Sequence, residues 1–200
     1  MTRRPRTAEA TEKRKPYRSP YEAYPFLGEP AADRRCDFEL LTDEMASQTG
    51  LLRSLLPADM PELRSELQWI GEMIYHLNAT ARSGKQMATE DISQLLHLTR
   101  LRQVQAETQG FVLPAGTAAA CIAHILRVQA KKAVRLLYAQ AEMGQTGLEP
   151  GIDFVSLLSA YFFALALSLN AAAGTEEIPF VSRVYRSPDS EQQPSRQAEA

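Results

Sequence analysis

The sequence predicts an all-α protein, an antiparallel five-helix bundle, and three observations lead to this fold class. Apolar residues recur at helical spacing in five separate segments. Proline or glycine residues separate these segments, and none shows the period-two alternation of a strand. With 200 residues, of which 44% are hydrophobic, the chain can fill the core of one such domain.

The first two helices are defined by their apolar stripes. Residues 37–56 carry one stripe, which stops at Pro57. Residues 60–81 carry the second, in steps of four and three, and Ser83-Gly84 ends it. This spacing is typical of a helix packed in a bundle.

Capping and helix-breaking residues place the other three helices. Thr89 is the expected N-cap of the third helix. The fourth is expected over residues 118–143 and the fifth over 153–170, after a break at Pro150-Gly151. Five helices of this length favour an antiparallel bundle.

Outside the helical region the chain is polar. We expect a disordered or irregular basic arm over residues 1–35, a bundle domain over 36–182 and a polar tail over 183–200. The arm is either a solvated segment or a docking segment, and its composition leaves both open. The net charge of −2 gives no sign of a nucleic-acid partner.

Other features predict a cytoplasmic protein without a membrane span. No apolar segment follows the basic N-terminus, as a secretory signal would require. The apolar run Phe154 to Leu169 is short for a membrane span and suits a buried helix. Cys36 and Cys121 are then expected as reduced thiols. No cysteine pair has zinc-ligand spacing and the three histidines are far apart, so we expect no metal held by protein alone.

The fourth helix carries a row of cations. Arg127, Lys131 and Arg135 follow at i, i+4 and i+8, and Lys132 adjoins them. No Asp or Glu occurs between residues 108 and 141 to neutralise them. The row is either a solvated face, a set of partners for acids on another helix, or an anion site. For an anion site, a polyphosphate is the natural ligand.

The residues before this helix bear on the same question. Gly116 and Thr117 lead into the helix, and a helix N-terminus after a glycine loop offers N–H groups to an anion. The loop lacks the P-loop pattern, which excludes a Walker-type NTPase.

The loop and helix together resemble a known family. The segment Phe111-Val-Leu-Pro-Ala-Gly-Thr117, followed by His124 and the cation row, is similar to the signature of the PduO-type ATP:cob(I)alamin adenosyltransferases. There a Phe-x-x-Pro-Gly-Gly-Ser/Thr loop leads into a His-x-x-Arg-x-x-x-Arg-Arg-Ala-Glu-Arg helix. Weaker similarities flank it: Thr42-Asp43-Glu44-Met45 with Gly50-Leu51-Leu52 resembles the family's Val-Asp-Glu-Leu…Gly-Leu helix, and Leu158-Ser159 its Asn-Arg-Leu-Ser-Asp helix.

The resemblance implies the cobalamin adenosyltransferase-like fold and a homotrimer with active sites between subunits. ATP with Mg²⁺ would lie against the basic helix, and reduced cobalamin would attack the 5′ carbon of ATP and release triphosphate. The ATP-binding residues would be Arg127, Lys131, Lys132, Arg135, Gly116 and Thr117. Arg135, Lys131 and Asp43 would be catalytic, with Asp43 paired to Lys131 of a neighbouring subunit. Phe111 would lie near the cobalamin, unless it is a plain core residue.

Several departures mark a divergent member. The family's N-terminal Thr-Arg-Thr-Gly-Asp loop has no counterpart around residues 17–28. Val134 replaces the signature Glu, and Ser156 and Ala160 replace the Asn and Asp of the last motif. The lysine pair keeps the charge of Arg-Arg but loses its bidentate geometry. The alternative is therefore a non-catalytic relative that serves as a corrinoid- or nucleotide-binding or scaffold subunit.

Overall fold

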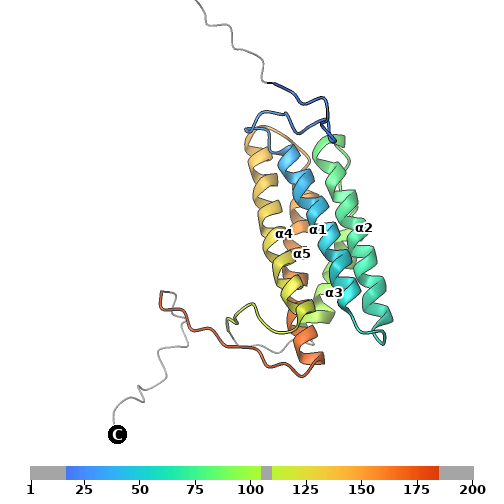
Figure 1. Cartoon of the computed structure of the whole chain (residues 1–200), viewed down its shortest axis with the longest axis vertical. Helices are drawn as coiled ribbons and strands as arrows, with labels where there is room; N and C mark the ends of the chain where they lie inside the picture. The colour runs from blue at the N-terminus through green and yellow to red at the C-terminus, as the bar shows by residue number, and fades with distance from the viewer. Residues whose placement is uncertain (1–16, 105–109, 185–200) are drawn as a thin grey trace, which may run out of the picture.

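The computed structural model describes residues 17–104 and 110–184 and contains five α-helices within them (Figure 1). They are α1 (Arg35–Leu55), α2 (Pro61–Ser83), α3 (Thr89–Val104), α4 (Ala118–Glu142) and α5 (Glu149–Ala172). In these residues the only β-type pairing is an isolated bridge between Val112 and Pro179. The predicted all-α class is confirmed. The arm up to residue 16 and the tail from residue 185 lie outside the described residues.

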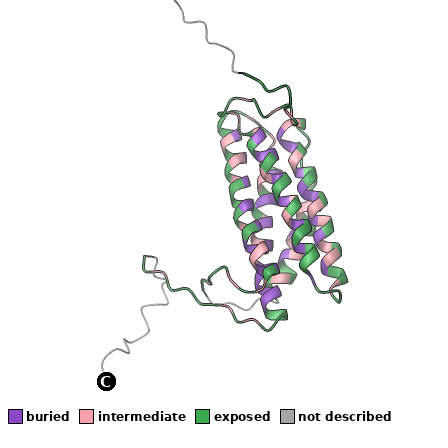
Figure 2. Ribbon diagram, viewed as in Figure 1, coloured by how far each residue is buried: buried purple, intermediate pink, exposed green. Residues whose placement is uncertain are grey.

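The helices form two layers. In Figure 1, α4, α1 and α2 lie side by side at the front, and α5 and α3 lie behind them. The closest helix pairs are α4 with α5, α1 with α2, α3 with α5, and α1 with α4. Figure 2 shows the buried residues on the inward faces of the helices.

Helix α5 is the apolar centre of the bundle. It has 24 residues, and an 18-residue window within it has a mean hydropathy of 1.9, enough for a membrane span, but 61% of that window is buried inside the bundle. Tyr161, Phe162 and Phe154 on this helix are among the largest fully buried side chains. The facing side of α4 is lined with small residues, including Ala123, Ala130 and Ala133, which let the two helices approach closely.

The predicted break at Pro150-Gly151 is wrong, because both residues belong to the first turn of α5. Proline is tolerated there because the first-turn N–H has no intrahelical partner. Gly151 is buried, and a Cβ placed on it would lie 3.6 Å from Leu77 and 3.7 Å from Leu137. Both distances are ordinary van der Waals contacts, so Gly151 marks where α5 packs against α2 and α4, and an alanine would also fit there.

Of the two threonines at helix starts, Thr117 is an N-cap, whereas the cap expected at Thr89 is displaced by one residue. Thr117 is the N-cap of α4, and its hydroxyl accepts a 3.1 Å hydrogen bond from the Ala120 N–H. Helix α3 begins at Thr89 itself, and the Ala88 carbonyl accepts from the Ile92 N–H at 3.2 Å. Its cap thus falls one residue earlier than expected.

The segment before α1 contacts the end of α2 through Arg82. The Arg82 guanidinium donates to Glu29 at 2.9 and 2.7 Å and lies 3.6 Å above the Phe26 ring. Its Nε donates to buried Glu39 at 2.5 Å. Residues 26–29 are thereby held against the bundle, whereas the boundary between arm and domain at residues 35–36 stays a prediction.

Candidate functional site

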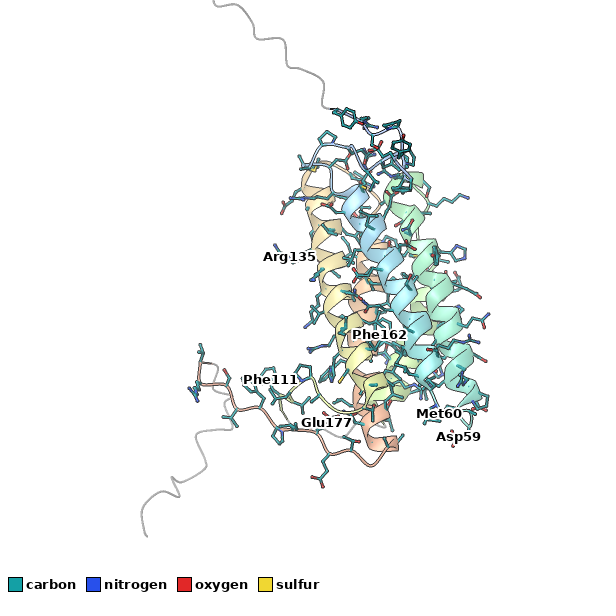
Figure 3. The ribbon with its side chains drawn as sticks, viewed as in Figure 1. Asp59, Met60, Phe111, Arg135, Phe162 and Glu177 are labelled. Atoms are coloured by element: carbon teal, nitrogen blue, oxygen red, sulfur yellow. The ribbon has the colours of Figure 1, made fainter. Side chains whose placement is uncertain are left out.

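Three of the four cations in the α4 row are exposed and have no acidic partner in the part of the chain that the structure describes. Lys131, Lys132 and Arg135 are exposed, and none makes an ion pair with another described residue. Figure 3 shows Arg135 on the outer side of α4, facing away from the other helices. Among residues 17–104 and 110–184, no acid on another helix pairs with these three cations. The row remains free for solvent or for an anion.

Arg127 differs from the other three cations because it is half-buried. Its guanidinium lies 5.3 Å from the centre of the Phe163 ring on α5, within cation–π range. Its Nε is buried and has no hydrogen-bond partner among the described residues. Phe163 thus orients the Arg127 guanidinium, whose N–H groups remain available as donors to an anion.

His124, one turn before Arg127, packs on the same aromatic ring. The two ring centres lie 6.2 Å apart, and both His124 nitrogens are buried without a partner in the described part of the chain. Burial, and then the charge of Arg127, lower the pKa of His124 below its ordinary value. His124 is therefore neutral at pH 7 and adds no charge to the row.

The loop before α4 is held by a residue of α5. Asn170 accepts a 3.0 Å hydrogen bond from the Thr117 N–H and donates a 3.0 Å bond to the Ala115 carbonyl. Gly116, between them, has a φ of +115°, and a Cβ there would lie 2.1 Å from the Asn170 amide oxygen. Only glycine fits at this position. The Thr117 N–H, which the sequence suggested for an anion, is occupied by Asn170.

Phe111 lies at the end of the bundle on a short two-stranded ribbon, in which residues 111–113 run beside residues 178–180 (Figure 3). The Leu113 N–H donates to the Ile178 carbonyl at 2.9 Å, and the Phe180 N–H donates to the Phe111 carbonyl at 2.8 Å. The Phe111 side chain is 67% exposed, which excludes the plain core role. Leu113, Ile178 and Phe180 are exposed beside it and make the ribbon apolar.

Asp43 is exposed on α1 and has a partner on α2. Its carboxylate accepts a 2.8 Å hydrogen bond from the Tyr75 hydroxyl, and this bond raises the pKa of Tyr75. No ion pair joins Asp43 to Lys131 within the described chain. The sequence-predicted site residues therefore fall into three places in one chain: the α4 row with Gly116 and Thr117, the Phe111 ribbon, and Asp43.

Sequence reasoning missed three residues that shape these places: Phe163, Tyr75 and Asn170. Phe163 and Tyr75 lie within ordinary helical patterns and carry no local signal. Asn170 does carry a local signal. It is an amide at the end of an apolar run, four residues before Gly174, and such a residue is typical of a helix terminus that bonds to another segment.

These features define a class of helical-bundle proteins with a cationic, anion-accepting face on one helix and an apolar ribbon at the start of that helix. The sequence profile of one such family, described as cobalamin adenosyltransferase, matches residues 32–169. The chain belongs to this cobalamin adenosyltransferase family. No curated protein sequence matches the chain.

Solved structures of similar shape agree with this assignment. Two are variants of the PduO-type ATP:corrinoid adenosyltransferase from Lactobacillus reuteri complexed with cobalamin and ATP, at 22% and 21% identity, each with a TM-score of 0.68. They cover 74% and 75% of this chain, and 84% and 87% of theirs. A third variant, complexed with ATP, has 23% identity, a TM-score of 0.67, and coverage of 74% and 88%. At such identities the likeness shows the shared fold.

Proposed function

We propose that the protein is an ATP:corrinoid adenosyltransferase, which transfers the 5′-deoxyadenosyl group of ATP to reduced cobalamin and releases triphosphate. The observation that supports the proposal is the cation row on α4, three of whose four members are exposed. Its spacing resembles the family's signature helix, and it lies within the residues that the family profile matches. An ordinary solvated face would intersperse acids, because like charges at i, i+4 disfavour a helix by about 0.2–0.5 kcal/mol per pair.

The reaction explains why cations are needed. The electron pair on Co(I) attacks C5′ of ATP, and a cobalt–carbon bond forms as the C5′–O bond breaks. The electrons of the broken bond remain on the triphosphate oxygen, and cobalt becomes formally Co(III). The leaving group therefore gains charge in the transition state, and fixed cations beside it lower the barrier.

The residues of the row divide this task. Arg135 and Arg127 can each bind two phosphate oxygens at once, and Phe163 already orients Arg127. Lys131 and Lys132 act as point charges. Gly116 and Thr117 lie at the positive end of the α4 dipole, about 15 Å along the helix from Arg127 and about 27 Å from Arg135. They are therefore too far from the row to bind the same phosphates, and Asn170 already occupies the Thr117 N–H.

Phe111 would supply the apolar surface for the corrinoid, and its exposure on the ribbon supports this role. Mg²⁺ would arrive with the phosphates of ATP. The described residues contain no group of three His, Cys, Asp or Glu side chains that could hold a metal ion, and Mg²⁺ prefers oxygen ligands that the cation row does not offer.

The proposal includes a homotrimer in the cytoplasm, without a nucleic-acid or membrane partner. Because Asp43 and Lys131 are not paired within one chain, a salt bridge between them would join two subunits. A groove of about 540 Å³ between α1 and α2 adjoins Tyr75 and is lined by Gly50 and Gly71. These small residues leave room for a helix of a second copy.

The alternative is a non-catalytic family member that binds corrinoid or nucleotide or serves as a scaffold subunit. The observation in its favour lies on α5, where Ser156 and Ala160 stand in place of the family's Asn and Asp. Ser156 is exposed, so the family's Asn at this position would face the surface, where it could contact a ligand. The shorter serine has less reach for such a contact.

One assay separates the two functions. Cobalamin is reduced chemically to cob(I)alamin under anaerobic conditions and incubated with the protein and MgATP. We expect the cob(I)alamin absorption bands to disappear and a photolabile alkylcobalamin spectrum to replace them, with release of triphosphate. Binding of cobalamin without this conversion would support the non-catalytic alternative.

A further inference from the structure

We propose that Asn170 and Glu177 are positioning residues, which hold the Phe111 ribbon in place against the start of α4 and thereby set the affinity for the corrinoid. The inference rests on the proposed function, in which Phe111 lies beside the corrinoid. It concerns two residues that touch neither the cation row nor the exposed face of the ribbon.

Both the oxygen and the nitrogen of the Asn170 side-chain amide are hydrogen-bonded. The side chain is fully buried near the end of α5. Its oxygen accepts from the Thr117 N–H at 3.0 Å, and its nitrogen donates to the Ala115 carbonyl at 3.0 Å and to the Glu177 carboxylate at 2.9 Å. One side chain thus joins three segments: the loop before α4, the α5 terminus, and the chain that follows α5.

Glu177 connects this centre to the ribbon. It directly precedes Ile178, whose carbonyl accepts from the Leu113 N–H, and Phe180 then donates to the Phe111 carbonyl. The chain reaches this path by turning at Gly174, which has a φ of +63°. The hydrogen bonds therefore close a ring from Asn170 through Glu177 and the ribbon to Phe111, and back through Ala115.

This ring fixes a segment that little else holds. The ribbon side chains Phe111, Leu113, Ile178 and Phe180 are all exposed, so packing against the core contributes little to their position. If the Glu177 bond is lost, the ribbon gains freedom in the unbound protein. Corrinoid binding must then order it, and this cost appears as weaker affinity.

ATP binding should be insensitive to the same change. Lys131 and Arg135 lie 14 and 18 residues beyond Thr117 on the continuous helix α4, about four to five turns away. Their positions depend on the packing of α4 against α5 and α1, which the ribbon does not alter. A split between corrinoid affinity and ATP affinity therefore distinguishes positioning from a general structural role.

The test compares Glu177→Ala with the wild type and with Glu176→Ala, an exposed neighbour without a described partner. Binding of cob(II)alamin is measured by absorbance at saturating MgATP, and binding of MgATP by calorimetry. We expect Glu177→Ala to raise the corrinoid Kd about tenfold, the equivalent of one charge-assisted hydrogen bond. The ATP Kd and Tm should change little, and Glu176→Ala should match the wild type.

Exchanging the amide and the carboxylate between the two positions tests whether corrinoid affinity can be restored. Asn170→Asp places a carboxylate against that of Glu177 and should weaken corrinoid binding further. Adding Glu177→Gln restores a donor–acceptor pair at the same place, so the double variant should regain affinity relative to Asn170→Asp. If Asn170→Asp does not fold, Glu177→Ala decides alone. An unchanged corrinoid Kd in Glu177→Ala would overturn the inference, whereas a wild type that binds no corrinoid would overturn the proposed function as well.

Discussion

The buried hydroxyl of Tyr161 on α5 donates a 2.6 Å hydrogen bond to the Glu66 carboxylate on α2. Arg102 on α3 donates to the same carboxylate at 3.1 and 2.5 Å. Burial, and then the charge of Glu66, raise the pKa of Tyr161 well above its ordinary value, so the hydroxyl keeps its proton. One polar cluster thus joins three helices inside an apolar core.

Removing the carboxylate should destabilise the fold more than removing the hydroxyl. Glu66→Leu leaves the half-buried Arg102 without this carboxylate. Breaking a fully buried pair costs about 3–5 kcal/mol, so we expect a loss of about 2–3 kcal/mol here. Tyr161→Phe leaves Glu66 bonded to Arg102 and should cost about 1 kcal/mol. Urea unfolding measures both, with the exposed Glu62→Leu on the same helix as a control. Equal losses for Glu66→Leu and Glu62→Leu would contradict the prediction.

Protonation of His124 should oppose folding. The pKa of His124 is lowered from 6.5 in the folded protein by burial and by Arg127. Below about pH 6.5 the unfolded chain therefore binds more protons at this residue than the folded chain, and stability falls as the pH falls. His124→Leu removes this contribution, so the wild type should lose more stability than the variant between about pH 7.5 and about pH 5. Other groups titrate in both proteins and cancel in the comparison.

Unfolding curves at several pH values check this prediction. The control is His76→Leu, because His76 is exposed on α2. This variant also removes one imidazole but leaves the core unchanged, so it separates the effect of burial from the loss of a histidine. If the stabilities of the wild type and His124→Leu stay parallel over the whole range, His124 does not titrate differently on folding.

The sequence was sufficient for features that depend on neighbouring residues. Apolar spacing and the helix-ending residues Pro57 and Gly84 located the helices, and the cation row could be recognised because all its members lie on one helix. The wrong break at Pro150-Gly151 has a local cause, since proline both ends helices and occupies their first turn.

The contacts that organise the site could not be predicted in this way. The bond from Thr117 to Asn170 spans 53 residues, and that from Tyr75 to Asp43 spans 32. Such pairs form only when the packing of two helices has set their rotation, and a single sequence does not specify that rotation. Phe163 beneath Arg127 and His124 depends on the same α4–α5 packing.

Assembly should depend on Asp43. Sedimentation at micromolar concentration should give about three times the 22.2 kDa mass of the chain, as the family resemblance implies. Asp43→Lys should shift the protein toward monomer, because it would bring like charges together between subunits. Adding Lys131→Asp restores an opposite pair and should restore the trimer. Tyr75→Phe, which removes only the bond within the subunit, is the control. A wild-type monomer would contradict the intersubunit site.

The last prediction concerns the cation row itself. If Arg127, Lys131 and Arg135 bind a triphosphate, they repel one another in the free protein and the anion relieves this repulsion. Arg135→Ala should then weaken MgATP binding by about 1.5–3 kcal/mol, the value of a charge-assisted hydrogen bond. The unliganded variant should lose no stability, because Arg135 has no ion pair among the described residues. Calorimetry with MgATP and melting curves of the free proteins measure both quantities.

Each interpretation of the row gives a different result in this experiment. A solvated face predicts unchanged ATP affinity, and pairing with acids predicts a loss of stability without ATP. Arg100→Ala is the matched control, since Arg100 is an exposed arginine on α3. Lys131→Ala is less informative, because pairing with Asp43 across subunits would mix binding with assembly. The anion site is refuted if MgATP does not raise the Tm of the wild type, or if Arg135→Ala binds MgATP as tightly as Arg100→Ala does.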